Sequence, residues 1–199
     1  MIMLDNQAPD FDARSTLGRI RLADLRGRWI CLFSHPADFT PVCSSEFLAF
    51  ERSRPAFEAE HCQLIGISVD SVHAHLAWVH QLQADHGVRL GFPIIEDVGM
   101  KIGQAYGMIH PSATSTSAMR SVFFIDPEGI VRTILTYPMQ IGRSIEEILR
   151  VLKALKATAQ AQASAPAGWQ PGDDLVGQDL QALEATFTPT WGHDPAREQ

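Results

Sequence analysis

Residues 29–47 read WICLFSHPADFTPVCSSEF, an apolar run that passes into a polar segment and then into a helix-forming stretch. The first six residues form the kind of continuous apolar run found in strands buried on both faces of a sheet. A second run of this kind, LIGISV, follows at residues 64–69. Residues 44–60 carry three phenylalanines at helical spacing between the two runs, which predicts a crossover helix. We therefore predict a βαβ unit with two central parallel strands.

Two elements next to this unit extend the predicted architecture. Residues 11–25 alternate apolar and polar side chains around a Leu-Gly turn, which predicts a short hairpin at an edge. Residues 72–85 place apolar side chains at helical spacing and are followed by Gly87, which favours the end of a helix. We expect this second helix to be another crossover.

The second half of the chain completes the predicted sheet. Residues 121–126 and 130–137 are joined by a Pro-Glu-Gly turn, which predicts two strands antiparallel to each other. Residues 144–147 read SIEE, a capping box that opens a helix extending to about residue 156. The predicted fold class is therefore α/β, with a central mixed sheet flanked by helices.

The composition favours one folded domain with an appendage. Of the 199 residues 45% are hydrophobic and 20% are charged, close to the average of globular proteins. The net charge of -7 disfavours partners bound through phosphates, so we expect no nucleic acid partner. No apolar run reaches the roughly 18 residues that span a bilayer, and the first residues lack a secretion signal. We expect neither membrane insertion nor export.

The composition changes near residue 158. We expect a main domain over residues 1–157 and a linker with a C-terminal extension over residues 158–199. Residues 158–167 are rich in Ala, Gln and Ser, which is typical of a linker. The acidic remainder carries more apolar groups than a solvated tail needs, so we expect it to pack on a partner subunit. These groups are Trp169, Leu175, Val176, Leu180, Leu183, Phe187 and Trp191.

Cys43 is the candidate nucleophile among three cysteines. It lies where the buried strand passes into a helix, and a first-turn cysteine meets unpaired N–H groups that favour a thiolate. Thr40 lies one turn earlier, where its hydroxyl can bond the sulfur or the atom that the sulfur attacks. Pro36 and Pro41 stiffen this segment. The three cysteines lack a C-x-x-C pair, which indicates a reducing cytoplasm and neither a disulfide framework nor a structural zinc site.

The pattern Pro36-x-x-x-Thr40-x-x-Cys43 resembles the active-site signature of the peroxiredoxins, which are thiol-dependent peroxidases. The resemblance extends over nearly the whole chain. Residues 166–173, with the pattern Pro-x-x-Trp-x-x-Gly-Asp, are similar to the tail of the one-cysteine, peroxiredoxin-6-like branch. The resemblance implies an elaborated thioredoxin-like fold with a C-terminal dimerisation extension, and an antioxidant enzyme that uses no cofactor.

The resemblance also implies a role for each matching residue. Cys43 corresponds to the peroxidatic cysteine, Thr40 to the residue that holds the peroxide in line, and Pro36 to the residue that shields the product from water. Arg120 corresponds to the arginine that stabilises developing charge, and Glu46 to the glutamate that orients it. Two further residues match groups that line the pocket, His35 and Arg143.

The implied reaction is attack of the Cys43 thiolate on hydrogen peroxide or an alkyl hydroperoxide, which leaves a cysteine sulfenate. No cysteine follows Cys62, so the resolving cysteine of the commonest two-cysteine members is missing. An external thiol of the thioredoxin, glutaredoxin or glutathione kind must then reduce the sulfenate. The resemblance further implies a homodimer built by the edge strand near residues 132–137 and the tail, with assembly into a ring left open.

Alternatives remain for the whole protein and for its other thiols. A peroxide sensor or a holdase-like chaperone needs only a reactive thiol, whereas turnover needs a positioned transition state. An acyl hydrolase needs a histidine within reach of Cys43, and only His35 is near it in sequence. Cys31 lies within an apolar strand and is expected to be a core thiol. Cys62 could resolve the sulfenate only if its Cα came within about 7 Å of that of Cys43.

Alternatives also remain for the side chains around the nucleophile. Arg120 and Arg143 could be solvated, Glu46 could be an ordinary first-turn glutamate, and His35 could bond nearby backbone. Three histidines at positions 73, 75 and 80 lack the i, i+4 spacing by which a helix grips zinc. We expect these three histidines on a solvated helix face, and we predict no metal site.

Overall fold

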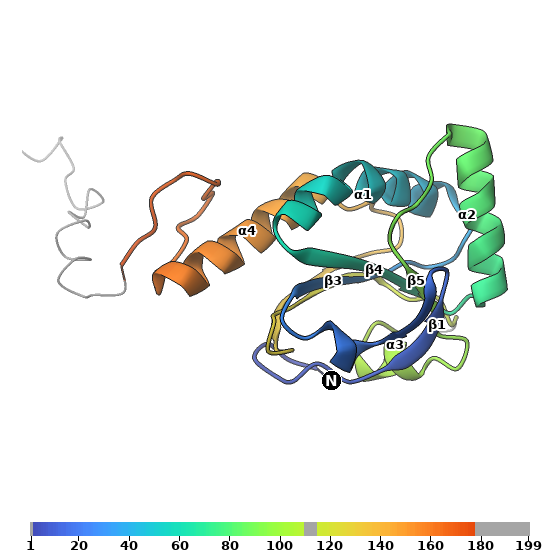
Figure 1. The fold of residues 1–199 in the computed structure, drawn as a ribbon, viewed down its shortest axis with the longest axis horizontal. Coiled ribbons are helices and arrows are strands. Elements are labelled where there is room, and N and C mark those ends of the chain that lie inside the picture. Colours follow the sequence, from blue (N-terminus) through green and yellow to red (C-terminus); the bar gives the residue numbers. More distant parts are fainter. Residues whose placement is uncertain (1, 110–114, 178–199) are drawn as a thin grey trace, which may run out of the picture. The chain divides into compact units, whose positions relative to one another are not determined.

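The computed structural model describes residues 2–109 and 115–177. The chain divides into two compact units, Met1–Leu149 and Arg150–Gln199. The first unit holds a seven-stranded sheet in the order β2-β1-β5-β4-β3-β6-β7 (Figure 1). Its strands are β1 (Asp12–Ser15), β2 (Gly18–Arg21), β3 (Trp29–Ser34), β4 (Cys62–Ser68), β5 (Ile94–Glu96), β6 (Arg120–Ile125) and β7 (Val131–Tyr137). The helices are α1 (Pro41–Ala59), α2 (Val72–His86), α3 (Lys101–Ala105) and α4 (Ile145–Ala161), with a short 3-10 helix at Leu22–Leu25.

The predicted βαβ unit is confirmed. Strands β3 and β4 are parallel and paired from Trp29 with Cys62 to Ser34 with Ile67, and α1 connects them. Strands β6 and β7 are antiparallel to each other, and β6 is antiparallel to β3. The sheet is therefore mixed, as the pattern of apolar runs predicted.

Side chains alternate between two apolar layers, because successive residues of a strand point to opposite faces. Ile30 and Leu32 of β3 join a core cluster that also contains Phe123 of β6 and Tyr106, which follows α3. Phe33 points to the other layer, where its ring stacks on that of Phe50 of α1 at 4.0 Å between centroids. In Figure 1 helices α1 and α2 lie on one face of the sheet and α3 lies on the other. The layer under α1 is the one that holds the site.

Short elements escaped the sequence analysis. Strand β5 has three residues and α3 has five, and segments of this length carry too little periodicity to be recognised. Helix α1 begins at Pro41 rather than at Ser44, because proline at the first helical position needs no hydrogen-bonded N–H. This earlier start makes Cys43 the third residue of the helix.

The predicted linker begins inside a helix. Helix α4 continues to Ala161, since alanine and glutamine are good helix formers, and so the expected boundary at residue 157 falls within it. Trp169 is buried, and its indole N–H donates to the Asp173 carbonyl of the same unit at 3.0 Å. Its carbonyl accepts from Arg150 at 2.9 Å. Four of the predicted packing residues lie outside the described residues: Leu180, Leu183, Phe187 and Trp191.

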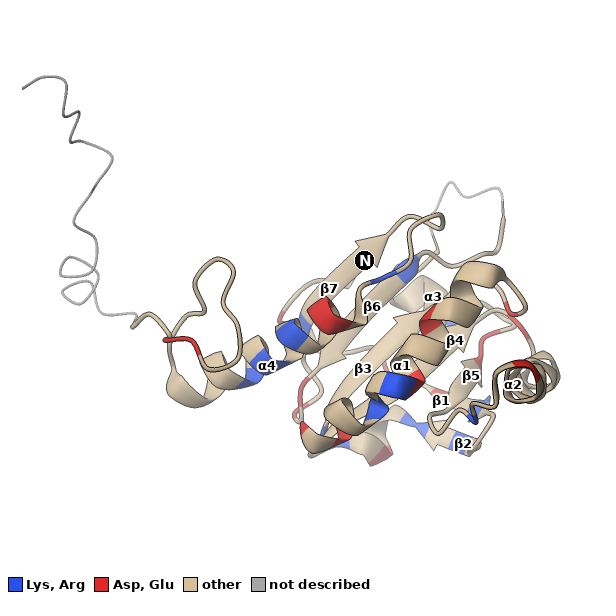
Figure 2. Cartoon of the chain, turned by 90° about the horizontal axis from the view of Figure 1, so that it is seen from above, with Lys and Arg blue, Asp and Glu red and all other residues tan. Residues whose placement is uncertain are grey.

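Both signs of charge occur along α1 and α4 (Figure 2). On α1 the side chain of Arg54 bonds Glu51 at 2.8 Å and also pairs with Glu58. Such partly exposed pairs near the surface contribute little to the free energy of unfolding. Among the described residues, each helix is too short or too polar to cross a bilayer.

Candidate active site

Cys43 lies in the first turn of α1 with no part of its surface exposed. Thr40 is the N-cap residue, but its hydroxyl donates to the Ala37 carbonyl at 3.0 Å and makes no cap bond. Of the two partners expected for this hydroxyl, the sulfur is not the one to which it donates, and a bond to the atom that the sulfur attacks stays a prediction. Because the cap hydroxyl is turned away, the first-turn N–H groups of α1 and the positive end of its dipole remain beside Cys43.

Arg120, the first residue of β6, brings a positive charge to the sulfur. Its Nη1 lies 3.3 Å from Cys43 Sγ and 2.8 Å from Glu46 Oε2. Its Nε donates to the Met139 carbonyl at 2.9 Å, which fixes the guanidinium plane. Arg120 and Cys43 are 77 positions apart, so only the pairing of β6 with β3 brings them together.

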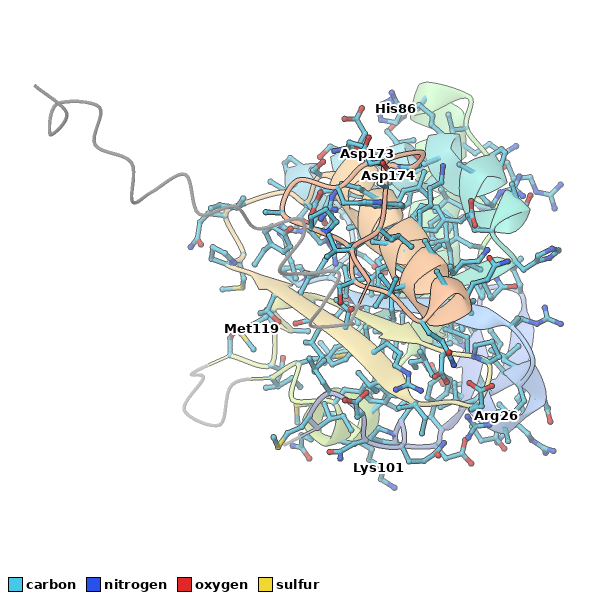
Figure 3. The ribbon with its side chains drawn as sticks, turned by 90° about the vertical axis from the view of Figure 1, so that its left-hand side faces the viewer. Arg26, His86, Lys101, Met119, Asp173 and Asp174 are labelled. Atoms are coloured by element: carbon cyan, nitrogen blue, oxygen red, sulfur yellow. The ribbon has the colours of Figure 1, made fainter. Side chains whose placement is uncertain are left out.

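Arg143 holds Glu46 in place. Its Nε and Nη2 bond the two carboxylate oxygens of Glu46 at 2.9 and 2.8 Å, the bidentate geometry that suits arginine. Its Nη1 donates to the carbonyls of Ser34 and Ser121 at 2.9 and 3.1 Å. The Ser34 hydroxyl in turn donates to the carbonyl of Met119. Met119, which is labelled in Figure 3, directly precedes β6. These bonds tie α1, β3 and β6 together around the site.

Glu46 is ionised although it is buried. Burial opposes the charge of Glu46, but the hydrogen bonds and charge of Arg143, with the charge of Arg120, hold its pKa below the ordinary value. The two guanidiniums and one carboxylate leave one positive charge in excess. A thiolate on Cys43 brings these four side chains to neutrality, which favours the anion because unbalanced buried charge is costly.

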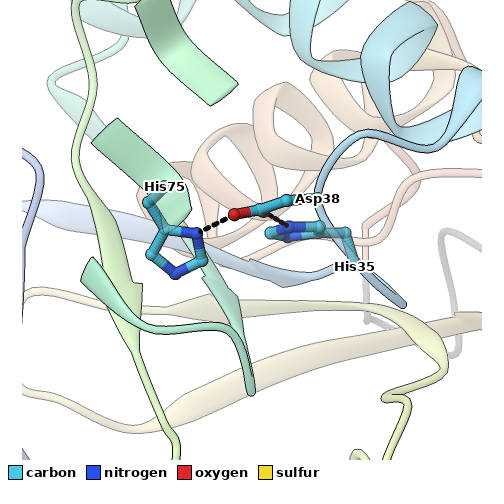
Figure 4. Close-up of side chains that lie close together, drawn as sticks. All are labelled: His35, Asp38 and His75. Atoms are coloured by element: carbon cyan, nitrogen blue, oxygen red, sulfur yellow. Dashed lines mark hydrogen bonds and ion pairs between the residues drawn. The ribbon is translucent and has the colours of Figure 1, made fainter. Parts of the chain in front are cut away.

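His35 belongs to a second buried group, which it forms with Asp38 and His75 (Figure 4). Its Nε2 lies 2.8 Å from Asp38 Oδ1, and His75 Nδ1 lies 2.8 Å from Asp38 Oδ2. Burial lowers the pKa of His35 more strongly than the bond and charge of Asp38 raise it. The neutral ring therefore carries its proton on Nε2, toward the carboxylate. The ring of His35 therefore bonds a carboxylate, and the alternative of a bond to nearby backbone was wrong.

The prediction of a solvated helix face was wrong for His75. Residues 73 and 80 are exposed, but His75 is fully buried on α2. Val72, Trp78 and Leu82 are buried on the same helix, so the 3.6-residue period places His75 on the inner face. That spacing was the signal that could have identified it.

The two histidines and Asp38 form a hydrogen-bonded chain. Their ligand atoms all lie within 4.8 Å of one another, a separation that invites comparison with a metal centre. The nitrogen–oxygen distances of 2.8 Å are those of hydrogen bonds. Metal ligands instead converge on a point about 2.0–2.2 Å from each donor atom. The arrangement is therefore suited to orienting side chains.

The other two cysteines lie apart from the site. Cys31 is buried in the middle of β3, and burial raises the pKa of its thiol. From Cys43 to Ala59 helix α1 rises about 24 Å. The three residues from there to Cys62 can return at most about 11 Å. Cys62 therefore fails the 7 Å condition for a bridge to Cys43, and the structure has no disulfide among the three.

The remaining predicted residues fall in the loop between β3 and α1. Pro36 is buried there, directly after His35. The structure thus gathers Cys43, Arg120, Glu46 and Arg143 into one bonded network, and it places Pro36 and Thr40 in the loop that leads to it. Asp38 and His75 are the two residues of this region that sequence reasoning missed.

Known proteins resemble this chain over most of its length. The AhpC/TSA family matches residues 4–134. A protein named peroxiredoxin 2 from Caldanaerobacter subterraneus subsp. tengcongensis is 54% identical over 169 residues, which cover 85% of this chain and 76% of that protein. A peroxiredoxin from Methanosarcina mazei is 42% identical over 192 residues, which cover 93% of this chain and 88% of that one.

Solved structures agree with these relatives. A yeast mitochondrial 1-Cys peroxiredoxin superposes with a TM-score of 0.83 at 38% identity, covering 94% of this chain and 93% of that chain. The C45S mutant of peroxiredoxin 6 of Arenicola marina superposes with a TM-score of 0.84 at 35% identity, covering 94% and 90%. The predicted thioredoxin-like fold is confirmed. By family match, identity and fold, the chain belongs to the peroxiredoxins of the AhpC/TSA family and is a thiol-dependent peroxidase.

Proposed function

We propose that Cys43 is the peroxidatic cysteine of this peroxidase. The observation that carries the proposal is the approach of Arg120 Nη1 to within 3.3 Å of Cys43 Sγ, inside a buried network that a thiolate neutralises. A nucleophilic sulfur needs this kind of positively charged surrounding. Cys31 is also buried, and there burial raises the pKa of the thiol more strongly than the charge of Arg143 lowers it, which supports Cys43 over Cys31.

The geometry supports a direct displacement on the peroxide. The Cys43 thiolate attacks the terminal oxygen, the S–O bond forms as the O–O bond breaks, and the departing oxygen takes a proton to leave as water or an alcohol. Arg120 stabilises the charge that develops on the two oxygens. The hydroxyl of Thr40 donates its hydrogen bond to the Ala37 carbonyl, so its lone pairs are available to accept a hydrogen bond from the O–H of the peroxide. Because Cys43 is fully buried, peroxide entry requires movement of the surrounding side chains.

We further propose that an external thiol completes the cycle. Two molecules of thiol reduce the sulfenate, which releases water and a disulfide and regenerates the cysteine. The separation of Cys62 from Cys43 supports an outside reductant. The similar yeast 1-Cys peroxiredoxin is described as resolved via glutathione/thioredoxin systems, which favours a reductant of that kind here.

The test is rapid mixing of the reduced protein with hydrogen peroxide, followed by intact mass measurement. Wild type should react fast and gain about one oxygen, roughly 16 Da, whereas C43S should show neither change. C31S and C62S serve as matched controls and should react like wild type. A loss of about two hydrogens would indicate an internal disulfide and contradict the external cycle. Oxidation of C43S at the wild-type rate would refute the role of Cys43.

An assay of repeated turnover distinguishes a peroxidase from a peroxide sensor or a chaperone. Wild type supplied with excess peroxide should consume thioredoxin or glutathione over many cycles. A sulfenate that forms once and is not reduced by either thiol would instead favour the peroxide sensor. Substrate preference follows from the same assay, with hydrogen peroxide and an alkyl hydroperoxide compared at equal concentration.

We also propose a homodimer that works in a reducing compartment such as the cytoplasm. Strand β7 ends the sheet order and has only β6 as a neighbour in the described part of the chain, which supports pairing with a second copy. Light scattering of the full chain should give twice the monomer mass. A stable monomer at micromolar concentration would contradict the dimer.

The three unbridged thiols support a reducing compartment such as the cytoplasm. Fractionation of cells would test this location.

A further inference from the structure

The loop that leads to Cys43 contains a strained residue. This active-site loop, residues 35–40, connects β3 to α1. Phe39 within it has a φ of +60°, a left-handed conformation that is rare for a bulky side chain. Its side chain is half exposed, so packing of the ring does not explain the conformation. Such a conformation persists only where neighbouring groups hold the backbone in place.

Asp38 provides contacts that restrain the backbone at Phe39. It directly precedes Phe39, and its carboxylate accepts bonds of 2.8 Å from both His35 and His75. Its backbone N–H donates to Asp70 Oδ2 at 3.1 Å, at the end of β4. Burial opposes the charge, yet the two histidine bonds keep the pKa of Asp38 below its ordinary value. The residue is therefore anchored through both its side chain and its backbone.

His75 of α2 binds the second carboxylate oxygen of Asp38. It belongs to α2, whose N-terminus is capped by Ser71, and its side chain is fully buried. Its Nδ1 faces the Asp38 carboxylate and its Nε2 faces the Ile95 carbonyl at 3.3 Å. Both partners offer oxygen acceptors, so an N–H of the ring can donate to either of them.

We propose that His75 and Asp38 are positioning residues for the peroxidase reaction. Their hydrogen bond clamps the active-site loop to α2 and β5, and so sets where Thr40 and the first turn of α1 place the Cys43 sulfur. They act through the backbone that leads from Asp38 to Cys43. The inference rests on the proposed role of Cys43, and it goes beyond it by assigning a function to a buried pair outside the arginine network.

Substitutions at His75 separate positioning from simple packing. H75L keeps a buried apolar volume but removes both donors, and the rate constant for sulfenate formation with hydrogen peroxide should fall about 10- to 100-fold, as misplacement of a reacting group does. H75N places an amide N–H near the position of Nδ1 and should recover most of the rate. The matched control is H80L on the exposed face of α2, which should react like wild type.

Alkylation of the same sulfur by iodoacetamide supplies the second readout. This reaction does not need a peroxide held in line, so H75L should be alkylated at least as fast as wild type. D38N keeps the shape of Asp38 but removes its charge, and it should lose peroxide reactivity as H75L does. Circular dichroism checks that each variant is folded. If H75L does not fold, H75N and D38N decide the question.

The outcomes distinguish this inference from the proposed function. If folded H75L and D38N react with peroxide at the wild-type rate while C43S is inert, the clamp is overturned and Cys43 keeps its role. An equal loss of peroxide and iodoacetamide reactivity would also overturn positioning, because it would indicate a general change in the thiol. If C43S is still oxidised at the wild-type rate, the proposed function itself fails.

Discussion

Glu46 lies between two guanidiniums, and this one carboxylate determines the orientation of both. Arg143 binds it through two parallel bonds, and Arg120 binds it through Nη1 while the same nitrogen contacts Cys43. All these side chains are nearly inaccessible to water. Removing one partner would leave a buried charge uncompensated, which is far more costly than losing a surface pair.

Arg120→Lys tests the fork geometry at the residue scale. Lysine keeps the charge but presents a single ammonium, so it cannot bond Glu46, Met139 and the sulfur together. We expect the peroxide rate constant to fall about 100-fold, the typical loss of one donor that stabilises developing charge. Stopped-flow oxidation measures it, with exposed Arg52→Lys on α1 as control. A wild-type rate in R120K would show that the charge alone suffices.

The buried titratable groups predict how stability depends on pH. Burial lowers the pKa of His35 below its ordinary 6.5, so this group contributes stability above about pH 6.5 and loses it as the pH falls. Glu46 and Asp38 also have lowered pKa values, and their contributions are lost as the pH falls below the ordinary carboxyl range near 4.

Urea denaturation at several pH values checks this expectation. The free energy of unfolding should fall between about pH 7 and pH 5.5, where unfolded His35 takes up a proton before the folded ring does. H35Q keeps an N–H for Asp38 but cannot titrate, so its profile should be flatter in this range. H80Q, at an exposed position, is the control. A slope in H35Q equal to that of wild type would assign the dependence to other groups.

At the element scale, β4 packs closely against α1 beside the site. A Cβ added at Gly66 would lie 3.1 Å from the ring of Phe47, closer than most such contacts. That ring packs edge-on against His35 at 4.7 Å between centroids. Trp78 of α2 stacks on His35 at 5.3 Å, lies 4.7 Å from Phe47 between ring centroids, and bonds Ser44 of α1 through its indole N–H. The aromatic layer is therefore continuous from the sheet to the loop.

Gly66→Ala should destabilise the protein by about 1–3 kcal/mol, as overpacking of a filled core does. The ring of Phe47 must move, and the loop carrying His35 should respond with a slower peroxide reaction. Gly99→Ala is the matched control, because the nearest atom to its added Cβ is 3.9 Å away. Urea denaturation measures the first effect and stopped flow the second. Equal stability of G66A and wild type would mean that Phe47 moves freely.

At the scale of the whole molecule, all residues of the candidate active site belong to the first of the two units. The residues of the arginine network and of the His35 group all belong to the unit Met1–Leu149. Within the second unit Trp169 is buried, and Ser164 pairs with Val176 in an antiparallel bridge. The described part of this unit therefore has a local structure of its own.

Trp169→Ala tests that separation. Loss of a buried tryptophan typically lowers the free energy of unfolding by about 3–5 kcal/mol. A segment with few buried contacts then unfolds locally. Limited proteolysis with mass spectrometry should therefore detect new cleavage near residues 163–177. The peroxide rate constant should stay at the wild-type value. A large fall in this rate would show that the second unit contributes to the reaction.

The sequence alone determined the local features of this protein. The apolar runs of β3 and β4 and the phenylalanine spacing of α1 specified the βαβ unit, because burial patterns repeat over two to four residues. Cys43 could be placed in the first helical turn for the same reason. The family signature supplied Arg120, Glu46 and Arg143 as matched positions, without their contacts.

Only the tertiary structure decided which of these side chains meet. Glu46 bonds residues 74 and 97 positions away, and His75 reaches Asp38 across 37 positions. Such contacts depend on strand order and register, which periodicity does not encode. The turn of the Thr40 hydroxyl toward Ala37 and the burial of His75 were decided in the same way. A buried polar group must find its partner wherever the packed chain offers one, and packing is a property of the whole fold.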